Sequence, residues 1–405
     1  MKILMLGWEL PPHNSGGLGV ACLNMAHALA REGADIEFVV PYEAKHDGID
    51  YMDVVSATDI DPIFRYGGGA YESNGVEAKI IDSKNHPEKM SIRDIQGLYC
   101  DFIKNKMMDF KPDVIHAHDW LTYEAGILAK KRFHAPLIAH VHATEFDRAG
   151  MKPGNKLIHE IEYEGLMMAD EIIAVSESTK RLIHDKYNIP LDRISVAYNS
   201  LDEDFINREY KYDHVFKYID SMKASGYTVI STVGRFTIQK GLKFMMSAAK
   251  RALDKNPKLL FVFAGDGEEF PGLVEQAASL GISKNVLFTG FIRGKKLRDV
   301  YAVSDIFVMS SVSEPFGLTA LEAARHGDAL ILTNQSGVSE VIWSAMKYDY
   351  WDEMKLADEI LAIASSPALG KSLRANATEE YQKMSWDQVA KKCMKIYNKS
   401  IKHKR

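Results

Sequence analysis

Cysteine is scarce in this sequence and shows no pattern. The 405 residues include three cysteines, Cys22, Cys100 and Cys393, an odd number without the spacing of metal ligands. Neither a disulfide framework nor a cysteine-based metal site is therefore expected. The simplest interpretation is three reduced thiols in a cytoplasmic protein.

Long apolar runs are also missing. No stretch approaches the roughly 20 apolar residues that a membrane-spanning helix needs. The N-terminus, MKILMLGWELPP, indicates a strand followed by prolines rather than a signal peptide. We therefore expect no transmembrane segment, while a peripheral membrane contact stays open.

Charge of one sign is not in large excess. The formal net charge is −5, and charged residues make up 26% of the chain. This balance gives no reason to expect nucleic acid as a partner, and it indicates no oligomeric state.

The chain is too long for one ordinary core, and 46% of its residues are hydrophobic. Apolar runs of strand length alternate with helical patterns, which is typical of α/β domains. A polar stretch near residue 215 precedes a fresh α/β pattern. We predict an N-terminal Rossmann-like domain at 1–215, a second one at 216–380, and a terminal helix with a basic tail at 381–405.

One stretch, SSVSEPFGLTALEAARHG at 310–327, stands out. The preceding run at 305–311 predicts a buried parallel strand, and 317–325 predicts a helix. Glu314 then lies in the turn after the strand, and Glu322 on the first turns of the helix. Open α/β sheets bind ligands at such ends, and paired carboxylates accept hydrogen bonds from sugar diols. The spacing alone fits a surface helix equally well.

Two further loops suit phosphate groups. Gly16 and Gly17 lie between a predicted strand and a predicted helix, where backbone amides can approach an anion. The spacing is not G-x-G-x-x-G, which argues against a dinucleotide redox enzyme. Arg235 and Lys240 flank another strand-to-helix turn, where two cations would favour a diphosphate.

Two predicted strands end in histidines, in HAHD at 116–119 and HVH at 140–142. Alternate residues of a strand share a face, so a metal site is conceivable. No third ligand is evident, and structural histidines are the expected alternative.

The segments EPFGLTALEA, VGRFTIQKGL and HAHDW together resemble those of retaining glycosyltransferases of the broad glycosyltransferase family 4 group, similar to glycogen and starch synthases. The resemblance covers nearly the whole chain. It implies the GT-B fold, an α/β architecture in which two Rossmann-like domains face each other across a cleft and a C-terminal helix crosses back to the first domain.

The resemblance also implies roles for individual residues, without a metal or a cofactor. Catalytic roles are implied for Arg235, Lys240, Glu314 and His142. Donor binding is implied for Gly16, Gly17, Asp119, Phe291, Ile292, Phe316, Gly317, Leu318, Thr319 and Glu322. The acceptor candidates are Glu9, His13, Trp120, Glu145 and Arg148, with a loop at 67–69 expected near the acceptor.

The implied reaction is transfer of a hexose, first of all glucose, from ADP-glucose or UDP-glucose to an acceptor hydroxyl. An α-glucan is the first acceptor to consider. Asn14 replaces a lysine that glycogen synthases carry before the Gly16-Gly17 pair, which keeps lipid-linked and small sugar acceptors open. Two other activities compete: a nucleotide-sugar 2-epimerase of the same fold, and a nucleotide-sugar binding module without catalysis.

Overall fold

The computed structural model describes residues 1–13, 16–43, 45–60, 81–83, 86–107, 110–201 and 216–404. The predicted acceptor loop at 67–69 lies outside these ranges. No helix within them is long and apolar enough to cross a membrane.

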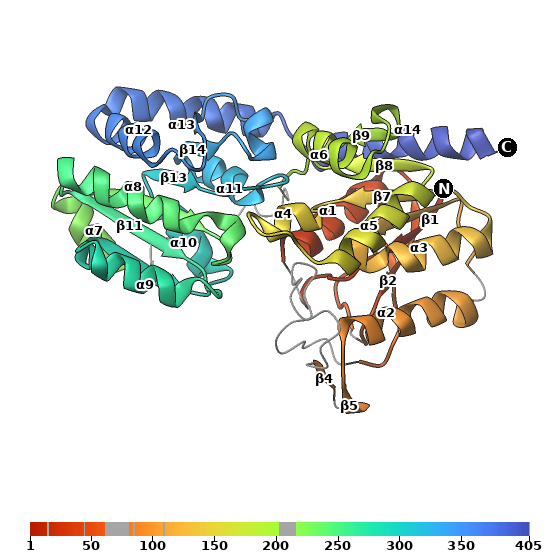
Figure 1. The fold of residues 1–405 in the computed structure, drawn as a ribbon. Helices are drawn as coiled ribbons and strands as arrows, with labels where there is room; N and C mark the ends of the chain where they lie inside the picture. Colours follow the sequence, from red (N-terminus) through yellow and green to blue (C-terminus); the bar gives the residue numbers. More distant parts are fainter. Residues whose placement is uncertain are drawn as a thin grey trace. The chain divides into compact units, whose positions relative to one another are not determined.

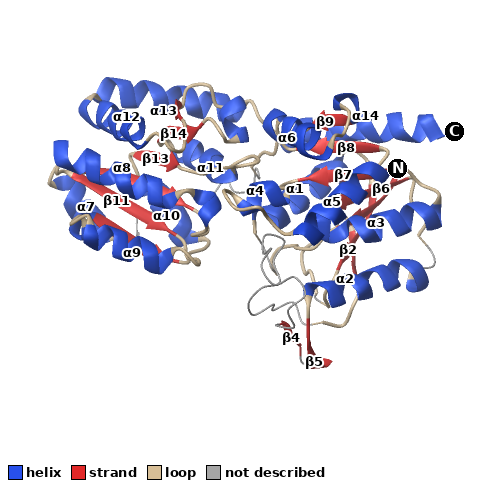
Figure 2. Cartoon of the chain, in the orientation of Figure 1, coloured by secondary structure: helices blue, strands red, loops and turns tan. Residues whose placement is uncertain are grey.

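The chain divides into two units, each built on its own sheet (Figures 1 and 2). Unit 1 comprises Met1–Asp202 together with Ser385–Arg405, and unit 2 comprises Glu203–Met384. Both main sheets are parallel throughout. Parallel strands need crossover helices, so the alternating pattern of the sequence leads to a helix-covered sheet in each unit.

Unit 1 has the strand order β3-β2-β1-β6-β7-β8-β9. A separate antiparallel pair is formed by β4 (Ile81–Ser83) and β5 (His86–Met90). The strands of the main sheet are β1 (Lys2–Leu6), β2 (Asp35–Val40), β3 (Asp53–Ser56), β6 (Val114–His118), β7 (Leu137–Val141), β8 (Glu171–Ala174) and β9 (Ile194–Val196).

Helices cover the sheet of unit 1 and include the C-terminal helix. They are α1 (Gly17–Arg31), α2 (Ile92–Asp101), α3 (Trp120–Phe133), α4 (Glu145–Ala149), α5 (Lys156–Met168), α6 (Glu177–Tyr187) and α14 (Trp386–Lys404), with short turns η1 (Phe102–Lys106) and η2 (Leu191–Arg193).

Helix α14 returns to unit 1 at the end of the chain, as the sequence predicts. It packs against α1, and Arg31 forms an ion pair with Asp387 at 2.6 Å. Ala390, Cys393 and Tyr397 on its inner face belong to the core of unit 1. Nineteen C-terminal residues therefore complete a core that begins at the N-terminus.

Unit 2 has the strand order β12-β11-β10-β13-β14-β15. Its strands are β10 (Thr228–Val233), β11 (Leu259–Ala264), β12 (Val286–Gly290), β13 (Ile306–Met309), β14 (Ala329–Thr333) and β15 (Met346–Tyr348). Its helices are α7 (Lys217–Ala224), α8 (Leu242–Lys255), α9 (Phe270–Ser279), α10 (Lys295–Val303), α11 (Leu318–His326), α12 (Glu353–Ser365) and α13 (Pro367–Gln382), with turns η3 (Ile238–Lys240), η4 (Ser283–Asn285) and η5 (Gly337–Glu340).

Apolar residues on both faces of the sheet explain the continuous apolar runs of unit 2. On β11, Phe261 and Phe263 join a core cluster with α8, α9 and α12, whereas Leu260 and Val262 join a second cluster with α7 and α10. Because successive side chains of a strand point to opposite faces, each face needs its own layer of helices.

Candidate functional site

In each main sheet the strand order runs outward in both directions from one pair of neighbouring strands, and several of the predicted site residues follow the carboxyl ends of these strands. In unit 1, neighbouring strands β1 and β6 lead to helices α1 and α3, and the strand order runs outward from them in both directions. In unit 2, β10 and β13 have the same relation. The crevice outside the carboxyl ends of two such strands is where open α/β sheets bind ligands. Each unit therefore contains one expected binding crevice.

In unit 2 the crevice is a pocket lined by residues from the ends of β10 and β13. Its lining includes Arg235, Lys240, Glu314 and Thr319. The Lys240 ammonium donates a hydrogen bond of 2.5 Å to Glu314 Oε2, and the Ser311 hydroxyl donates to the same oxygen at 2.9 Å. The fold thus brings together the two cations and the first glutamate, although they are far apart in the sequence.

The turn that carries Lys240 packs closely against the turn that follows β13. Gly241 has φ of +61°, and a Cβ there would lie 2.1 Å from the carbonyl oxygen of Ser310. The Ser310 hydroxyl donates to the Lys240 carbonyl at 2.9 Å, and the Val312 amide donates to the Gln239 carbonyl at 2.8 Å. Glycine is required at 241 both for its backbone and for this close approach.

Helix α11 begins beside this pocket. Gly317 precedes the helix with φ of +112°, and Thr319 in its first turn lines the pocket. Phe316 is buried, and its carbonyl accepts a hydrogen bond from the Val338 amide at 2.7 Å. Leu318 is half-buried at the first helical position. Free amides of a helix N-terminus favour an anion, so this end complements Arg235 and Lys240.

Glu322 lies one turn further along α11 and has a partner that the sequence pattern does not reveal. The Tyr301 hydroxyl on α10 donates to Glu322 Oε2 at 2.6 Å. Burial raises the pKa of Glu322, while the Tyr301 hydrogen bond lowers it. Tyr301 therefore holds one oxygen of Glu322 in place.

Phe291 and Ile292 follow β12, two strands away from β10. Phe291 is 65% exposed, and the Arg293 guanidinium lies 4.8 Å from its ring centre. Ile292 packs on the apolar cluster under α7 and α10. Neither residue lines the pocket that contains Lys240.

At the corresponding place in unit 1 lie Asp119 and His142, both of which are buried. Asp119 has φ of +58° and precedes α3, and its Oδ1 accepts hydrogen bonds from the amides of His142 at 2.6 Å and Ala143 at 3.4 Å. Its Oδ2 is buried without a hydrogen-bond partner in the described part of the chain. Burial raises the pKa of Asp119 to about 7, although Arg148 and the two amides lower it. Trp120, the next residue, is buried.

The two histidine pairs form one buried cluster, because β6 and β7 are neighbours in register. His118 pairs with His140 across the strands, and all four rings of His116, His118, His140 and His142 are at most 6% exposed. His118 Nδ1 lies 3.0 Å from His142 Nε2, and His116 Nε2 lies 3.1 Å from His140 Nδ1. Burial lowers the pKa of His116 and of His142 to about 3, so the rings are neutral near pH 7.

The glycine-rich turn of unit 1 is tied to Glu9. The Glu9 carboxylate is buried and accepts a hydrogen bond from the Gly16 amide at 2.9 Å. Gly16 and Gly17 are exposed at the start of α1. His13 lies in the same turn, and its ring makes edge contacts with Tyr42 and His46.

Glu145 and Arg148 lie on the short helix α4 rather than in the loop that the sequence predicts. Both side chains are at most 2% exposed and form an ion pair at 3.2 Å. Arg148 also donates to Glu162 at 2.5 Å and to the Ala143 carbonyl at 2.8 Å. An acceptor would have to compete with these bonds, so a contact of either residue with an acceptor stays a prediction.

Several residues of these crevices escape sequence reasoning. Tyr301 and Ser311 contact the two predicted glutamates, yet tyrosine on a helix and serine in a turn have no distinctive pattern. Cys22 on α1, together with His118 and His142, forms one of two groups in the described residues whose ligand atoms lie close enough for a metal ion. The sequence does not reveal this group, because Cys22 and the first of the histidines are almost a hundred residues apart.

Two family models match the chain and together cover most of it. The model described as Glycosyltransferase Family 4 matches residues 15–205, and that described as Glycosyl transferases group 1 matches residues 219–380. The two matched segments lie in unit 1 and unit 2, respectively, apart from three residues at the end of the first.

Curated relatives match the chain over nearly its full length. An uncharacterized glycosyltransferase of Methanocaldococcus jannaschii is 28% identical, with 98% of each chain covered. A glycogen synthase of Mycobacterium tuberculosis is 26% identical, with 98% of this chain and 94% of the relative covered. A D-inositol 3-phosphate glycosyltransferase of Rhodococcus erythropolis is 24% identical, with 96% and 87% covered.

Solved structures match the whole architecture. Anabaena HepE in complex with UDP and glucose has a TM-score of 0.72 and 17% identity, with 98% of this chain and 99% of that chain covered. At this identity the likeness shows the fold alone.

Proposed function

Because the chain belongs to the glycosyltransferases of the family 4 group with the GT-B fold, as its sequence predicts, we propose that it is a retaining hexosyltransferase. In this proposal it moves glucose from a nucleoside diphosphate sugar to an acceptor hydroxyl. The proposal includes the cytoplasmic location expected from its thiols.

One observation carries the donor half of the proposal. Arg235, Lys240, Glu314 and the first turn of α11 line the same pocket, although they come from two separate segments of the chain. Two cations and a helix N-terminus complement a diphosphate, and a carboxylate complements sugar hydroxyls. Glu322, held by Tyr301, would accept hydrogen bonds from the ribose.

The proposed chemistry follows from these charges. Negative charge builds up on the diphosphate as the bond to the sugar breaks, and Lys240 and Arg235 would stabilise it most at that moment. In the front-face mechanism, the departing phosphate oxygen takes the proton of the attacking hydroxyl, so retention needs no covalent intermediate. Glu314 would hold the sugar, with Lys240 and Ser311 fixing its carboxylate.

The donor is proposed to be UDP-glucose or ADP-glucose. The ligands in the HepE structure, UDP and glucose, support a uridine and glucose preference by analogy. Similarity to a glycogen synthase over nearly the whole chain supports glucose as the sugar and an α-glucan as the acceptor. Similarity to D-inositol 3-phosphate glycosyltransferases favours a second candidate, transfer to a small phosphorylated polyol or sugar.

The deciding experiment offers labelled UDP-glucose, ADP-glucose and their GDP counterpart with glycogen, maltooligosaccharides, inositol phosphate, glucose phosphates and a lipid extract. Transfer to glycogen or maltooligosaccharides with an α-linkage by NMR supports the proposal. Transfer only to inositol phosphate or to a glucose phosphate supports the second candidate. Transfer only to lipid would overturn both acceptor assignments. A β-linked product would overturn retention.

The same reaction mixtures test the two competing activities. A 2-epimerase would change the configuration of the donor sugar without an acceptor, and this would be visible by NMR of the nucleotide sugar. A silent binding module would bind UDP or ADP in calorimetry but release no nucleotide with any acceptor. Absence of binding to UDP, ADP and GDP would contradict the donor assignment itself.

A further inference from the structure

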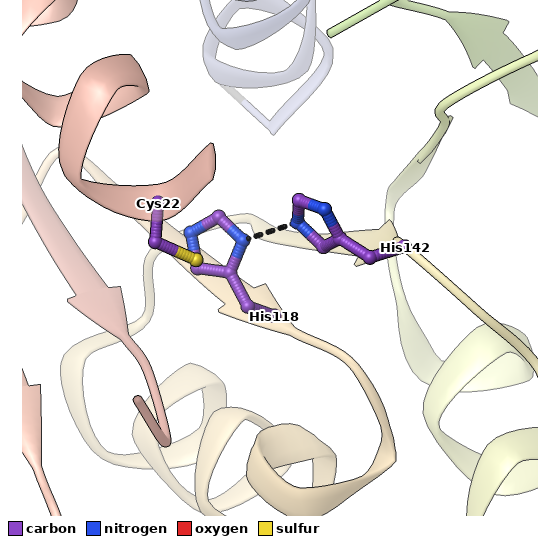
Figure 3. Close-up of side chains that lie close together, drawn as sticks. All are labelled: Cys22, His118 and His142. Carbon is purple, nitrogen blue, oxygen red and sulfur yellow. Dashed lines mark hydrogen bonds between the residues drawn. The ribbon is translucent and has the colours of Figure 1, made fainter. Parts of the chain in front are cut away.

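Unit 1 contains a buried group of potential metal ligands that the proposed reaction does not use as a group. Cys22 on α1, His118 at the end of β6 and His142 just after β7 each offer one ligand atom, and these atoms all lie within 4.8 Å of one another. Figure 3 shows the three side chains converging from three different segments of unit 1. All three are buried.

The cluster leaves polar atoms in the interior unpaired. His118 Nε2 and His140 Nε2 are buried and have no hydrogen-bond partner among the residues that the structure describes. Leaving a buried donor or acceptor unpaired typically costs about 1 to 3 kcal/mol. A single buried histidine whose ring nitrogens are hydrogen-bonded would need no further explanation. A thiol and several imidazoles gathered in one place, with ring nitrogens unpaired, need one.

We propose that Cys22, His118 and His142 form a binding site for a soft divalent metal ion, of which Zn²⁺ is the representative. A cysteine and two histidines are a ligand set that suits zinc and disfavours magnesium or calcium, which prefer oxygen ligands. With Zn–N and Zn–S bonds of about 2.0 to 2.3 Å, ligand atoms around a tetrahedral ion are roughly 3.3 to 3.6 Å apart. Small rotations of the three side chains therefore suffice to close the site.

A second group, His116, His118 and His140, fits the ion less well. Both nitrogens of His116 already have partners, because Nδ1 lies 2.5 Å from the Tyr397 hydroxyl and Nε2 lies 3.1 Å from His140 Nδ1. Binding a metal there would break these contacts. The set with Cys22 keeps both contacts of His116 and gives up at most the one between His118 Nδ1 and His142 Nε2. The ring of His140 stacks on that of His142, with the ring centroids 4.2 Å apart, and helps to hold this ligand in place.

Metal binding at this site releases one proton. The S–H bond of Cys22 breaks, a sulfur–metal bond forms, and the proton passes to solvent, while the two neutral imidazoles bind through nitrogen lone pairs. The Asp119 carboxylate, adjacent to His118 and with Oδ2 unpartnered in the described chain, adds negative charge near the ion. Three protein ligands leave a fourth position open. The ion would also compete with a sugar for His142, a consequence that rests on the proposed function.

Cobalt(II) is the probe, because tetrahedral Co²⁺ replaces zinc and absorbs visible light. The full-length protein, first treated with a chelator, is titrated with Co²⁺. We expect one equivalent to saturate intense visible bands and a near-ultraviolet sulfur-to-cobalt charge-transfer band, and one equivalent of Zn²⁺ to abolish both. Absence of these bands from the spectrum of the wild-type protein would overturn the proposal. No donor or acceptor is needed, so the outcome is independent of the proposed reaction.

Matched variants locate the site. Cys22→Ser keeps the size of the side chain and should lose the charge-transfer band, with affinity reduced at least about a hundredfold. His118→Gln should lower the affinity by a similar factor. Cys393→Ser replaces an equally buried thiol on α14 and should leave the spectrum unchanged. Each variant is first checked for a native circular dichroism spectrum and melting curve. A sulfur band that survives in Cys22→Ser, or disappears in a folded Cys393→Ser, would assign the metal to another place and refute the proposal.

Discussion

The ammonium group of Lys240 has three hydrogen-bond donors, and one of them is committed to Glu314. The side chains of this pair are 21% and 12% exposed, so water still reaches both. The remaining donors of Lys240 can serve a diphosphate without breaking the pair. The ion pair with Glu314 therefore leaves charge on Lys240 available for the leaving group of the proposed reaction.

Replacing Lys240 should affect turnover more than binding. We expect Lys240→Ala to lower kcat by roughly a hundredfold or more, because an electrostatic contact to developing charge is typically worth about 2 to 4 kcal/mol. Steady-state kinetics with the identified donor and acceptor provide the measurement. Lys243→Ala is the matched control, since Lys243 lies three residues further along, in the first turn of α8, and pairs with Glu269. Wild-type kcat in a folded Lys240→Ala variant would exclude the assigned role.

Glu359 on α12 makes stability depend on pH. It is 3% exposed, and its Oε2 is one of the buried atoms without a partner in the described ranges. Burial raises the pKa of Glu359 from 4.5 to about 7, although Lys355 lowers it. Between these values the folded chain binds more protons than the unfolded chain, so the stability contributed by protonated Glu359 is lost as the pH rises through this window.

Glu359→Gln should remove that dependence. We expect the variant to be more stable than the wild type by about 1 to 3 kcal/mol near pH 8, and to differ little near pH 4.5. Urea denaturation at both pH values measures the difference. Glu379→Gln changes a surface carboxylate on α13 and should have no such effect. Equal stabilisation at both pH values would show that charge is not the cause.

At the scale of elements, the sequence predicts the central strands well and the peripheral segments poorly. The apolar run at 305–311 becomes β13, and the following helix starts within one residue of its predicted position. Strands buried on both faces are apolar throughout, so their pattern is clear. The edge strand β3 has only partly buried or exposed residues and gives no such signal, and α4 is too short to show a helical period.

The site residues differ in the same way in how far the sequence predicts them. Glu314 and Lys240 are predicted because each belongs to a contiguous segment that resembles a family signature. Tyr301 is not, because its contact with Glu322 depends on how α10 packs beside α11. Cys22 is likewise recognisable only once α1 is placed over β6.

Tyr301→Phe tests whether this packing contact supports the ribose site that we propose at Glu322. Loss of the hydroxyl leaves one oxygen of Glu322 without its donor, and we expect the Kd for UDP or ADP to rise about 5- to 30-fold, which corresponds to about 1 to 2 kcal/mol. Isothermal calorimetry gives the value. Tyr218→Phe, on the exposed surface of α7, is the control. Unchanged nucleotide affinity in Tyr301→Phe would contradict the ribose assignment of Glu322.

The contact between the Lys240 turn and the turn after β13 can be tested with a pair of glycines. Gly241 and Gly281 both have φ between +60° and +70°, but a Cβ at 281 meets nothing within 4 Å whereas one at 241 would overlap Ser310. Both substitutions to alanine should cost about 1 kcal/mol for the left-handed backbone. Gly241→Ala should in addition displace the turn and lower nucleotide affinity at least tenfold. Thermal unfolding and calorimetry measure the two effects, and equal behaviour of the two variants would contradict the close approach.

At the scale of the whole molecule, the C-terminal helix belongs to the first unit although the second unit precedes it in the chain. A mutation near residue 390 should therefore destabilise unit 1. Ala390 is fully buried on α14, and Ala390→Asp would place a carboxylate in that core at a cost of several kcal/mol. We expect β1 and α1 to lose amide protection in hydrogen-exchange mass spectrometry.

Unit 2 provides the internal reference for that measurement. Strands β10 and β11 contribute to core clusters that are separate from the core of unit 1. Their amide protection should therefore stay at the wild-type level. Lys392→Asp introduces the same charge on the exposed side of α14 and should leave both units protected. Loss of protection confined to unit 2 would show that α14 does not stabilise unit 1.

The paired histidines of β6 and β7 also limit how this gene can change. His118 and His140 face each other across the two strands, His116 lies two residues before His118 on β6, and His142 lies two residues after His140, just beyond the end of β7. Inserting or deleting a single codon within Val114–His118 would shift the strand by one residue and turn both of its histidines to the opposite face. Point substitutions can be absorbed one side chain at a time, but a change of length cannot. Homologous genes should therefore vary in length in the connecting loops while these two strands keep a constant number of codons.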